Sequence, residues 1–271
     1  MPDLYAVIGN PIAHSKSPQI HQAFARQTEQ DLHYEAVLGD KDDFAASVDA
    51  FRQRGGKGMN VTVPFKLDAY DFADDVSQRG RRAAAVNTLI FQGDGKVLAD
   101  NTDGVGLVRD ITVNQQTPIT GKRVLLLGAG GACRGVLAPL LAEQPERIVI
   151  ANRTESRAEE LAKSFADLGA VSGCGFAGLS SERFDVIING TSAGLSDEVP
   201  PLPEDALNSD GFCYDMVYAN EPTAFVRWAM AHGAAKAVDG LGMLVEQAAE
   251  SFLLWRGVRP QTADVMAMLR G

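Results

Sequence analysis

The chain has 271 residues, 45% of them hydrophobic, which is enough for one large domain or two modest ones with a real core. Its formal net charge of -10 argues against a nucleic-acid surface, which needs clustered positive charge. The three cysteines, Cys133, Cys174 and Cys213, contain no C-x-x-C pair, so we expect neither a metal site nor a disulfide framework.

Nothing at the N-terminus resembles a signal peptide, because Met1–Tyr5 has no positive leader followed by a long apolar core. No apolar run is long enough to span a bilayer, so we expect no membrane partner and a cytoplasmic protein. The local basic patch of Arg79, Arg81 and Arg82 is interpreted as a solvated helix face.

The first hundred residues alternate between expected strands and helices. Residues 4–8 form a short apolar strand, and Ser17 before Pro18 is typical of a helix N-cap with proline at the first helical position. Residues 34–38 predict a second strand, and residues 44–51 predict a helix. The apolar triplets 89–91 and 97–99 flank a glycine-containing turn and predict a hairpin.

Two apolar runs in this part end in hydrogen-bonding residues, at Asn60–Lys66 and Asp100–Gly104. One cluster holds a lone lysine, Lys66, and the other a lone carboxylate, Asp103, just before a glycine. α/β proteins place chemistry at strand ends, and a tuned lysine can exchange a proton at neutral pH. A simple surface ion pair is the alternative, since that is the commonest fate of lysine and aspartate.

Further uncharged donors and acceptors lie near the same strand ends, a density that suits a small polyhydroxylated ligand. They are Asn60, Thr62, Asn87, Thr88, Asn101 and Thr102. Ser15-Lys16-Ser17-Pro18 is a candidate seat for a carboxylate, because first-turn N–H groups and two hydroxyls can donate to it. Ser17 is also explained as a helix cap, whereas Ser15 has no such structural need.

After Gly104 the pattern becomes that of a nucleotide-binding domain. Residues 124–127, 147–151 and 185–188 are continuous apolar runs, as expected for parallel strands buried on both faces, with helical segments between them. This alternation predicts a doubly wound sheet. The D-G-x-G sequence at residues 103–106 recurs at 239–242, so we expect the chain to cross a domain boundary twice.

The predicted organisation is two α/β domains, with the active site in the cleft between them. Residues 1–104 with 240–271 would form the substrate-binding and catalytic domain, and residues 105–239 a Rossmann-like domain. The paired glycines at the two crossings have two interpretations of equal weight. They permit hinge motion, or they mark helix starts that need close backbone packing.

A glycine-rich loop, Gly128-Ala129-Gly130-Gly131-Ala132, follows a buried strand and opens a helix, which is typical of a pyrophosphate site. Cys133 stands where the G-x-G-x-x-G pattern has its third glycine. The next strand ends at Asn152-Arg153-Thr154, with Arg157 one turn on, where an NAD site would place an acidic residue. A guanidinium favours a 2′-phosphate, so we expect NADP(H).

These motifs together resemble the shikimate dehydrogenase family over essentially the whole chain. The matching stretches are 9–18, 58–66, 85–88, 100–104, the loop at Gly128, 152–154 and 239–247. The resemblance implies reduction of 3-dehydroshikimate to shikimate by NADPH, in aromatic amino-acid biosynthesis. One departure is Gly190, where the family more often has alanine, and we expect only a local backbone effect.

The resemblance also implies roles for individual residues. The catalytic pair would be Lys66 and Asp103. The substrate-binding residues would be Ser15, Ser17, Thr62, Lys66, Asn87, Asp103, Tyr218 and Gln247. The cofactor-binding residues would be Gly128, Ala129, Gly130, Gly131, Ala132, Asn152, Arg153, Thr154, Arg157 and, on the nicotinamide side, Thr191, Met216, Gly240 and Met243. No metal is implied, and the expected assembly is a monomer or homodimer.

Three alternatives remain open. An NAD-preferring quinate/shikimate dehydrogenase would be expected to carry an acidic residue in place of Arg153. A non-catalytic NADP-binding sensor would have no need of both Lys66 and Asp103. An amino-acid or folate dehydrogenase with the same nucleotide domain would have no reason to keep Ser15 and Ser17.

Overall fold

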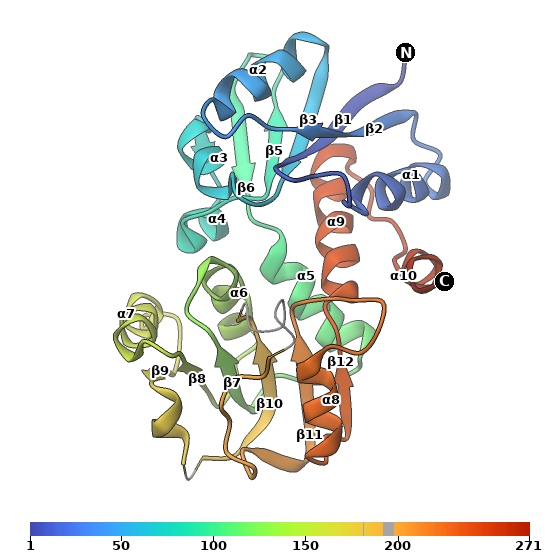
Figure 1. Cartoon of the computed structure of the whole chain (residues 1–271). Helices are drawn as coiled ribbons and strands as arrows, with labels where there is room; N and C mark the ends of the chain where they lie inside the picture. Colours follow the sequence, from blue (N-terminus) through green and yellow to red (C-terminus); the bar gives the residue numbers. More distant parts are fainter. Residues whose placement is uncertain (181, 192–197) are drawn as a thin grey trace. The chain divides into compact units, whose positions relative to one another are not determined.

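The computed structural model describes residues 1–180, 182–191 and 198–271, and its chain divides into two compact units (Figure 1). The first unit contains Met1–Gly106 and Val245–Gly271, and the second contains Leu107–Leu244. Within the described residues, none of the helices is both long and apolar enough to cross a membrane. The same residues include no cluster of three or more metal-ligating side chains.

The first unit is built on a six-stranded sheet in the order β2-β1-β3-β5-β6-β4. Its strands are β1 (Asp3–Gly9), β2 (Leu32–Leu38), β3 (Gly56–Val61), β4 (Asp75–Val76), β5 (Thr88–Phe91) and β6 (Val97–Asp100). Its helices are α1 (Ser17–Gln27), α2 (Phe44–Gln53), α3 (Lys66–Phe72), α4 (Gln78–Ala83) and α10 (Ala263–Arg270). Only β5 runs antiparallel to its neighbours, and its pairing with β6 confirms the predicted hairpin.

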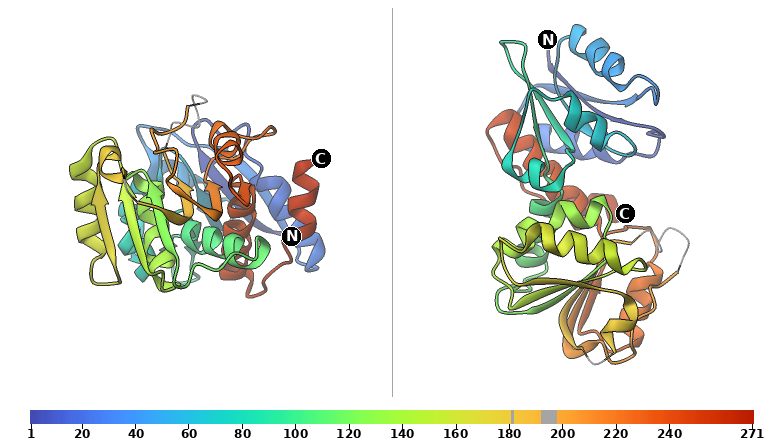
Figure 2. Two further views of the ribbon diagram at one scale, coloured as in Figure 1. Left: turned by 90° about the horizontal axis from the view of Figure 1, so that it is seen from below. Right: turned by 90° about the vertical axis from the view of Figure 1, so that its left-hand side faces the viewer.

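Helices cover both faces of this sheet (Figures 1 and 2). Ala6 and Ile8 of β1 pack with the aromatic residues of α2 and with Phe65. Tyr5 and Val7 point to the other face, because successive side chains of a strand alternate. On that face α1 and α9 (Leu241–Arg256) supply His21, Phe24, Phe252 and Trp255, whose rings are in mutual contact.

The second unit has an all-parallel sheet in the order β12-β11-β10-β7-β8-β9. Its strands are β7 (Arg123–Leu127), β8 (Arg147–Ala151), β9 (Val171–Cys174), β10 (Phe184–Asn189), β11 (Leu207–Asp215) and β12 (Lys236–Val238). This is the doubly wound order, with its switch point between β7 and β10. The three predicted apolar runs are the central strands β7, β8 and β10, so that prediction is confirmed.

The buried strands pack helices against both faces, which explains their continuous apolar character. Val124 and Leu126 face α6 (Gly131–Ala142) and α7 (Glu155–Phe165), together with the π-helical turn η1 (Asp110–Asn114) that follows α5 (Asp103–Arg109). Leu125 and Leu127 face α8 (Ala224–Ala231) and the 3-10 turn η2 (Phe176–Leu179).

The predicted N-cap at Ser17 is wrong. Ser17 is the first residue of α1, and the preceding Lys16 has near-helical dihedrals (φ -81, ψ -8) and makes no side-chain capping bond. Instead the Ser15 hydroxyl accepts from the Ser17 N–H at 3.3 Å. The helix therefore starts one residue earlier than the Ser-Pro signal suggested, with Pro18 in its second position.

At the second D-G-x-G sequence the glycines are required for close packing. A Cβ at Gly242 would collide with the Asp110 carboxylate, and one at Gly240 would collide with the Met216 carbonyl. Gly242 lies near the start of α9, which continues without a break to Arg256. These contacts favour the packing interpretation over a glycine hinge at this position.

Candidate active site

The first unit brings Lys66 and Asp103 into direct contact, although they stand 37 positions apart in the chain. Lys66 opens α3 and Asp103 opens α5, and the lysine Nζ donates to Asp103 Oδ2. Asn87 Nδ2 donates to the other carboxylate oxygen at 2.8 Å. The Lys66 side chain is 31% exposed and that of Asp103 14%, so both remain within reach of a ligand.

Backbone contacts explain why Asp103 stands where it does. The Asn87 N–H donates to the Asp100 carbonyl at 3.0 Å, which holds the start of β5 against the end of β6. The Asn101 side chain then accepts from the Asp103 N–H at 3.1 Å and donates to the Ala85 carbonyl at 3.0 Å. A helix N-terminus also favours a negative charge, so the start of α5 stabilises the Asp103 carboxylate.

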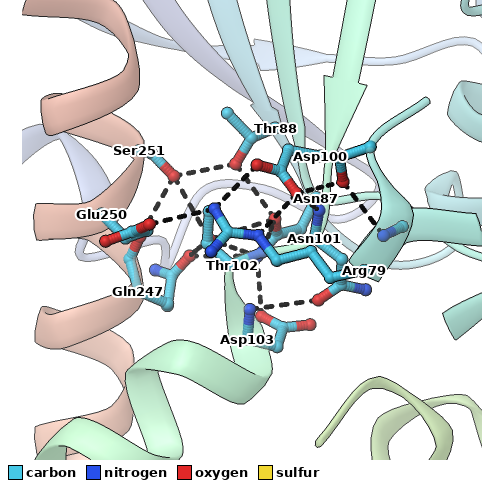
Figure 3. Close-up of polar contacts among 12 residues, drawn as sticks. Arg79, Asn87, Thr88, Asp100, Asn101, Thr102, Asp103, Gln247, Glu250 and Ser251 are labelled. Atoms are coloured by element: carbon cyan, nitrogen blue, oxygen red, sulfur yellow. Dashed lines mark hydrogen bonds and ion pairs between the residues drawn. The ribbon is translucent and has the colours of Figure 1, made fainter. Parts of the chain in front are cut away.

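Asn87 is at the centre of a buried polar cluster (Figure 3). Its amide nitrogen donates to Thr102 Oγ1 at 2.9 Å and to Gln247 Oε1 at 3.2 Å, besides Asp103. Its oxygen accepts from Thr88 Oγ1 at 3.0 Å and from the Thr102 N–H at 2.9 Å. Asn87 is 3% exposed and is hydrogen-bonded through both its amide nitrogen and its amide oxygen, so it holds a single orientation. The strand-end residues Asn60, Asn87, Thr88 and Thr102 therefore lie together in one hydrogen-bonded cluster.

The cluster continues into the interior from Asn60 through Ser251, Tyr34 and His21, three residues that the sequence analysis did not identify. Asn60 Nδ2 donates to Ser251 Oγ at 2.9 Å, and Tyr34 donates to Asn60 Oδ1 at 2.7 Å. The Tyr34 ring stacks on His21 with 4.2 Å between ring centroids. Burial lowers the pKa of His21 to about 3.

The interpretation of Arg79 as part of a solvated helix face is wrong. Its side chain is 26% exposed, and its guanidinium donates to both oxygens of Asp100 at 2.7 Å and to Glu250 at 3.0 Å. Asp100 also accepts from Ser77 at 2.5 Å. Arg79 therefore ties α4 to β6 and to α9 beside the polar cluster (Figure 3). By contrast, Arg81 is exposed and pairs with Asp75 at the surface.

The two candidate serines lie at the start of α1 in different surroundings. Ser17 is buried. Ser15 is partly exposed, with its hydroxyl bonded to the Ser17 N–H. Thr62 follows β3, its N–H donates to the Ile8 carbonyl at 2.9 Å, and its methyl group fills the space beside Gly9. These residues all belong to the first unit.

In the second unit, a pocket of about 740 Å³ lies at the switch point of the sheet. Its lining includes the whole glycine-rich loop and the ends of the neighbouring segments. The lining residues predicted from the sequence are Gly128, Ala129, Gly130, Gly131, Ala132, Asn152, Arg153, Arg157 and Thr191. The lining residues that the sequence did not indicate are Phe176, Gly190, Glu198, Val199, Pro200 and Pro201.

The glycine-rich loop is open toward this pocket. Gly128 has φ +106, a conformation that favours glycine, and a Cβ at Gly130 or Gly131 would meet nothing within 4 Å. α6 begins at Gly131 without a side-chain cap, so its first-turn N–H groups are available to an anion. Cys133 is fully buried, and its thiol lies 3.6 Å from the Gly190 carbonyl oxygen.

Cys133 also explains why glycine suits position 190. A Cβ at Gly190 would lie 2.5 Å from Cys133 Sγ and 3.0 Å from Met216 Sδ. The Cys133 side chain, at the position of the third motif glycine, thus occupies the space that a side chain at position 190 would need. The Gly190 N–H still donates to the Leu127 carbonyl at 2.9 Å, which fixes the end of β10 against the glycine-rich loop.

Both arginines expected at a phosphate are exposed at the pocket rim. Arg153 and Arg157 line it, and neither is paired with a carboxylate among the described residues. Asn152 Nδ2 donates to the Thr154 carbonyl at 2.8 Å, which shapes the turn between β8 and α7. Thr154 itself is exposed just before α7 and does not line the pocket.

The remaining predicted cofactor residues lie on three neighbouring segments of the second unit. Thr191 follows β10, Met216 follows β11, and Gly240 and Met243 lie at the start of α9. The Met243 N–H donates to the Tyr214 hydroxyl at 3.0 Å, and that hydroxyl donates to the buried Asp110 at 2.6 Å. Burial and the Asp110 charge raise the pKa of Tyr214 well above its usual value.

Tyr218 is the one predicted substrate residue in the second unit, on the segment after β11. Its side chain is partly exposed, and partial burial raises its pKa above the usual value. The hydroxyl is therefore neutral at neutral pH and available as a hydrogen-bond donor.

Three family models match the chain along its length. The shikimate dehydrogenase substrate-binding domain matches residues 7–89, the shikimate / quinate 5-dehydrogenase model matches residues 111–196, and the shikimate 5′-dehydrogenase C-terminal domain matches residues 240–270. A relative from Thioalkalivibrio sulfidiphilus named shikimate dehydrogenase (NADP(+)) is 60% identical over 268 residues, which is 99% of this chain and 98% of the relative.

Solved structures share the fold over nearly the whole chain. An Ael1 enzyme from Pseudomonas putida has a TM-score of 0.94 at 48% identity, covering 98% of each chain. Shikimate 5-dehydrogenase from Thermus thermophilus, solved in complex with NADP(H) and shikimate, has a TM-score of 0.87 at 32% identity. That match covers 99% of this chain and 98% of the other.

Proposed function

The chain belongs to the shikimate dehydrogenase family, and on that premise we propose how its residues carry out the family's reaction. It is an NADP-dependent oxidoreductase that acts on a CH–OH group and interconverts 3-dehydroshikimate and shikimate. The observation that carries the residue assignment is the contact of Lys66 and Asn87 with one carboxylate, Asp103.

We assign proton transfer to Lys66. Hydride transfer is the chemistry that NADPH supplies when bound, and the ketone oxygen gains negative charge as the ring carbon accepts the hydride. The Lys66 ammonium first stabilises this charge and then donates a proton to the oxygen. Asp103 accepts from Lys66 and Asn87, so it orients the ammonium and keeps one carboxylate edge for substrate hydroxyls. In the reverse direction, neutral Lys66 accepts the proton.

The substrate carboxylate is assigned to Ser15 and Ser17 at the start of α1, where hydroxyls and the helix N-terminus favour an anion. The ring hydroxyls are assigned to Thr62, Asn87 and Gln247. Asn87 and Gln247 are hydrogen-bonded to each other, so their orientations are linked. Tyr218 of the second unit is assigned to the carboxylate end, as the family resemblance implies.

The residues around the pocket in the second unit fit NADP(H). The open glycines and uncapped N-terminus of α6 match a pyrophosphate, because backbone N–H groups donate to it without steric conflict. Arg153 and Arg157 match the 2′-phosphate, since each is exposed at the rim and unpaired with a carboxylate among the described residues. The Phe176 ring offers an apolar surface for the adenine.

Initial rates with shikimate and quinate, each with NADP and NAD, test this function. Of the four pairs, we expect shikimate with NADP to have the highest specificity constant. Faster turnover of quinate with NAD would replace the proposal with the quinate/shikimate dehydrogenase alternative. NADP binding without turnover of either substrate would identify a sensor that has kept the fold.

We further propose a cytoplasmic enzyme that works as a monomer or homodimer. One chain supplies both groups of proposed ligand-facing residues, since Lys66, Asp103 and Asn87 lie in its first unit and the nucleotide pocket lies in its second. Sedimentation at assay concentration distinguishes the two assemblies. A larger oligomer that loses activity when it dissociates would contradict the proposal.

A further inference from the structure

Asp215, the last residue of β11, is a fully buried carboxylate in the second unit. Its Oδ1 accepts from Asn189 Nδ2 and from the Val217 N–H, each at 3.1 Å, and its Oδ2 accepts from the Thr223 hydroxyl at 2.6 Å. Burial outweighs these bonds and raises the pKa of Asp215. No cation pairs with it among the described residues, so its partners are neutral donors from three segments.

Two of those partners, Asn189 and Val217, are hydrogen-bonded to residues predicted to contact the cofactor. Asn189 Oδ1 accepts from the Thr191 hydroxyl at 2.7 Å and from its N–H at 3.2 Å. The Asn189 carbonyl accepts from the Met216 N–H at 2.8 Å, and the Val217 carbonyl accepts from the Gly240 N–H at 3.1 Å. Thr191, Met216 and Gly240 are therefore each one hydrogen bond away from a residue that Asp215 holds directly.

We propose that Asp215 is a positioning residue that fixes the segments holding the nicotinamide end of NADP(H). This inference rests on the proposed function, because it takes Thr191, Met216 and Gly240 as nicotinamide-side residues. Hydride transfer depends steeply on the alignment of donor and acceptor, and small displacements lower its rate strongly. A buried carboxylate that joins three segments restricts such displacements.

The chemistry of the site requires an acceptor at this position. Three donors converge on two oxygens, and an ionised carboxylate accepts from all of them. In Asp215→Asn the amide oxygen can still accept from Asn189 and from the Val217 N–H. The new amide nitrogen can donate to Thr223 Oγ1, provided that the Thr223 hydroxyl rotates from donating to accepting. Thr223 Oγ1 already accepts from the Val226 N–H at 3.2 Å, so it has capacity for this reversal. Asp215→Ala loses all three bonds.

The test compares two ligands that differ only at the nicotinamide end. Calorimetric titration measures NADP and 2′-phospho-ADP-ribose, which lacks the nicotinamide, against wild type, Asp215→Ala and Asp215→Asn. We expect Asp215→Ala to weaken NADP roughly tenfold, the effect of about one lost hydrogen bond, and to leave the truncated ligand unchanged. Asp215→Asn should weaken NADP binding less than Asp215→Ala and should also leave binding of the truncated ligand unchanged. If the alanine variant does not fold, the asparagine variant provides the test.

Asp185→Ala is the matched control. Asp185 lies on β10 toward the end opposite Asn189, and its carboxylate also accepts two bonds, from the Arg123 N–H and Asn208 Nδ2, both at 2.9 Å. This variant loses comparable contacts without touching Asn189 or Val217. We expect it to lower the melting temperature and to leave the ratio of the two affinities at the wild-type value.

The kinetic arm is the primary deuterium isotope effect on shikimate oxidation with shikimate deuterated at the reacting carbon. We expect this effect to rise in both Asp215 variants, because misaligned hydride transfer becomes more rate-limiting, and to stay unchanged in Asp185→Ala. Equal weakening of both ligands, or a lower melting temperature with wild-type affinities and isotope effect, would overturn the inference. The titration needs no substrate, so an inactive wild type would overturn the proposed function while the ligand pair still decides the role of Asp215.

Discussion

The first unit presents side chains to its ligand, whereas the second presents mainly backbone groups. Around Asp103 the converging groups are amides, hydroxyls and one ammonium, carried by residues such as Asn87 and Lys66. Around the glycine-rich loop the groups are N–H donors of residues with little or no side chain. Backbone donors recognise any pyrophosphate, so the proposed function assigns the distinction between one dinucleotide and another to the rim arginines, Arg153 and Arg157.

The two regions also differ in how they are held in place. In the first unit the ligand-facing residues bond one another directly, as Asn87 does with Gln247 and Asp103. In the second unit the segment with Thr191 is held by hydrogen bonds to the buried residue Asn189, which in turn donates to the buried Asp215. Substitutions of the ligand-facing residues in the first unit should therefore change shikimate turnover or binding, whereas substitutions of the rim arginines in the second unit should change the choice of cofactor.

The largest expected effect is on catalysis in the first unit. Lys66→Ala should lower kcat roughly a hundred- to ten-thousand-fold with little change in the shikimate KM, because proton transfer acts in the transition state. Steady-state kinetics check this, with Lys57→Ala, an exposed lysine on β3, as the control. A kcat near wild type with a raised KM would make Lys66 a binding residue.

The next effect is on cofactor choice in the second unit. Arg153→Asp should lower the NADP-to-NAD ratio of specificity constants by about tenfold to a hundredfold, the value of a hydrogen bond to a charged group. The new carboxylate repels phosphate and accepts from ribose hydroxyls. Arg183→Asp, at an exposed arginine of the same unit, serves as control. An unchanged ratio would show that Arg153 does not contact the 2′-phosphate.

A third test addresses the interior of the first unit through pH. The unfolded chain protonates His21 near its ordinary pKa of 6.5, and the folded chain only near a pKa of about 3. Below pH 6.5 the proton favours the unfolded chain, so the free energy of unfolding falls as the pH drops toward 3. Between pH 7 and pH 5 this amounts to about 2 kcal/mol.

Chemical denaturation of wild type and His21→Phe at both pH values measures this difference. The variant keeps an aromatic ring against Tyr34 and loses the titrating group. Its free energy of unfolding should depend less on pH than that of wild type over this interval. Identical pH dependence in the two proteins would mean that His21 is not held neutral by burial.

The last test separates two tyrosines that occupy paired positions on β1 and β2. Tyr34→Phe should lower the free energy of unfolding by about 1–3 kcal/mol, because it leaves the buried Asn60 oxygen without its donor. Tyr5→Phe is the control, since Tyr5 pairs with Tyr34 in the sheet and its hydroxyl lies 3.5 Å from Arg256. Equal losses in the two variants would remove the special role of the Tyr34 bond.

The family and fold class followed from local patterns of the sequence. Continuous apolar runs identified the central strands β7, β8 and β10, because a strand buried on both faces needs no polar alternation. The glycine-rich loop was recognisable because its function depends on a short stretch of backbone between one strand and one helix. Lys66 and Asp103 stood out as lone charges after apolar runs, although their contact could not be inferred from spacing.

Only the tertiary structure decided which polar residues meet. The sequence suggested that Arg79 lies on the surface, but in the structure its guanidinium is bonded to Asp100. It also suggested that Ser17 is a helix cap, but α1 begins at Ser17 itself, one residue earlier than expected. Asp215 carried a weak signal, a carboxylate that ends an apolar run, and its partners Asn189 and Thr223 lie on other segments. Contacts between distant segments depend on strand order and register, which local periodicity does not encode.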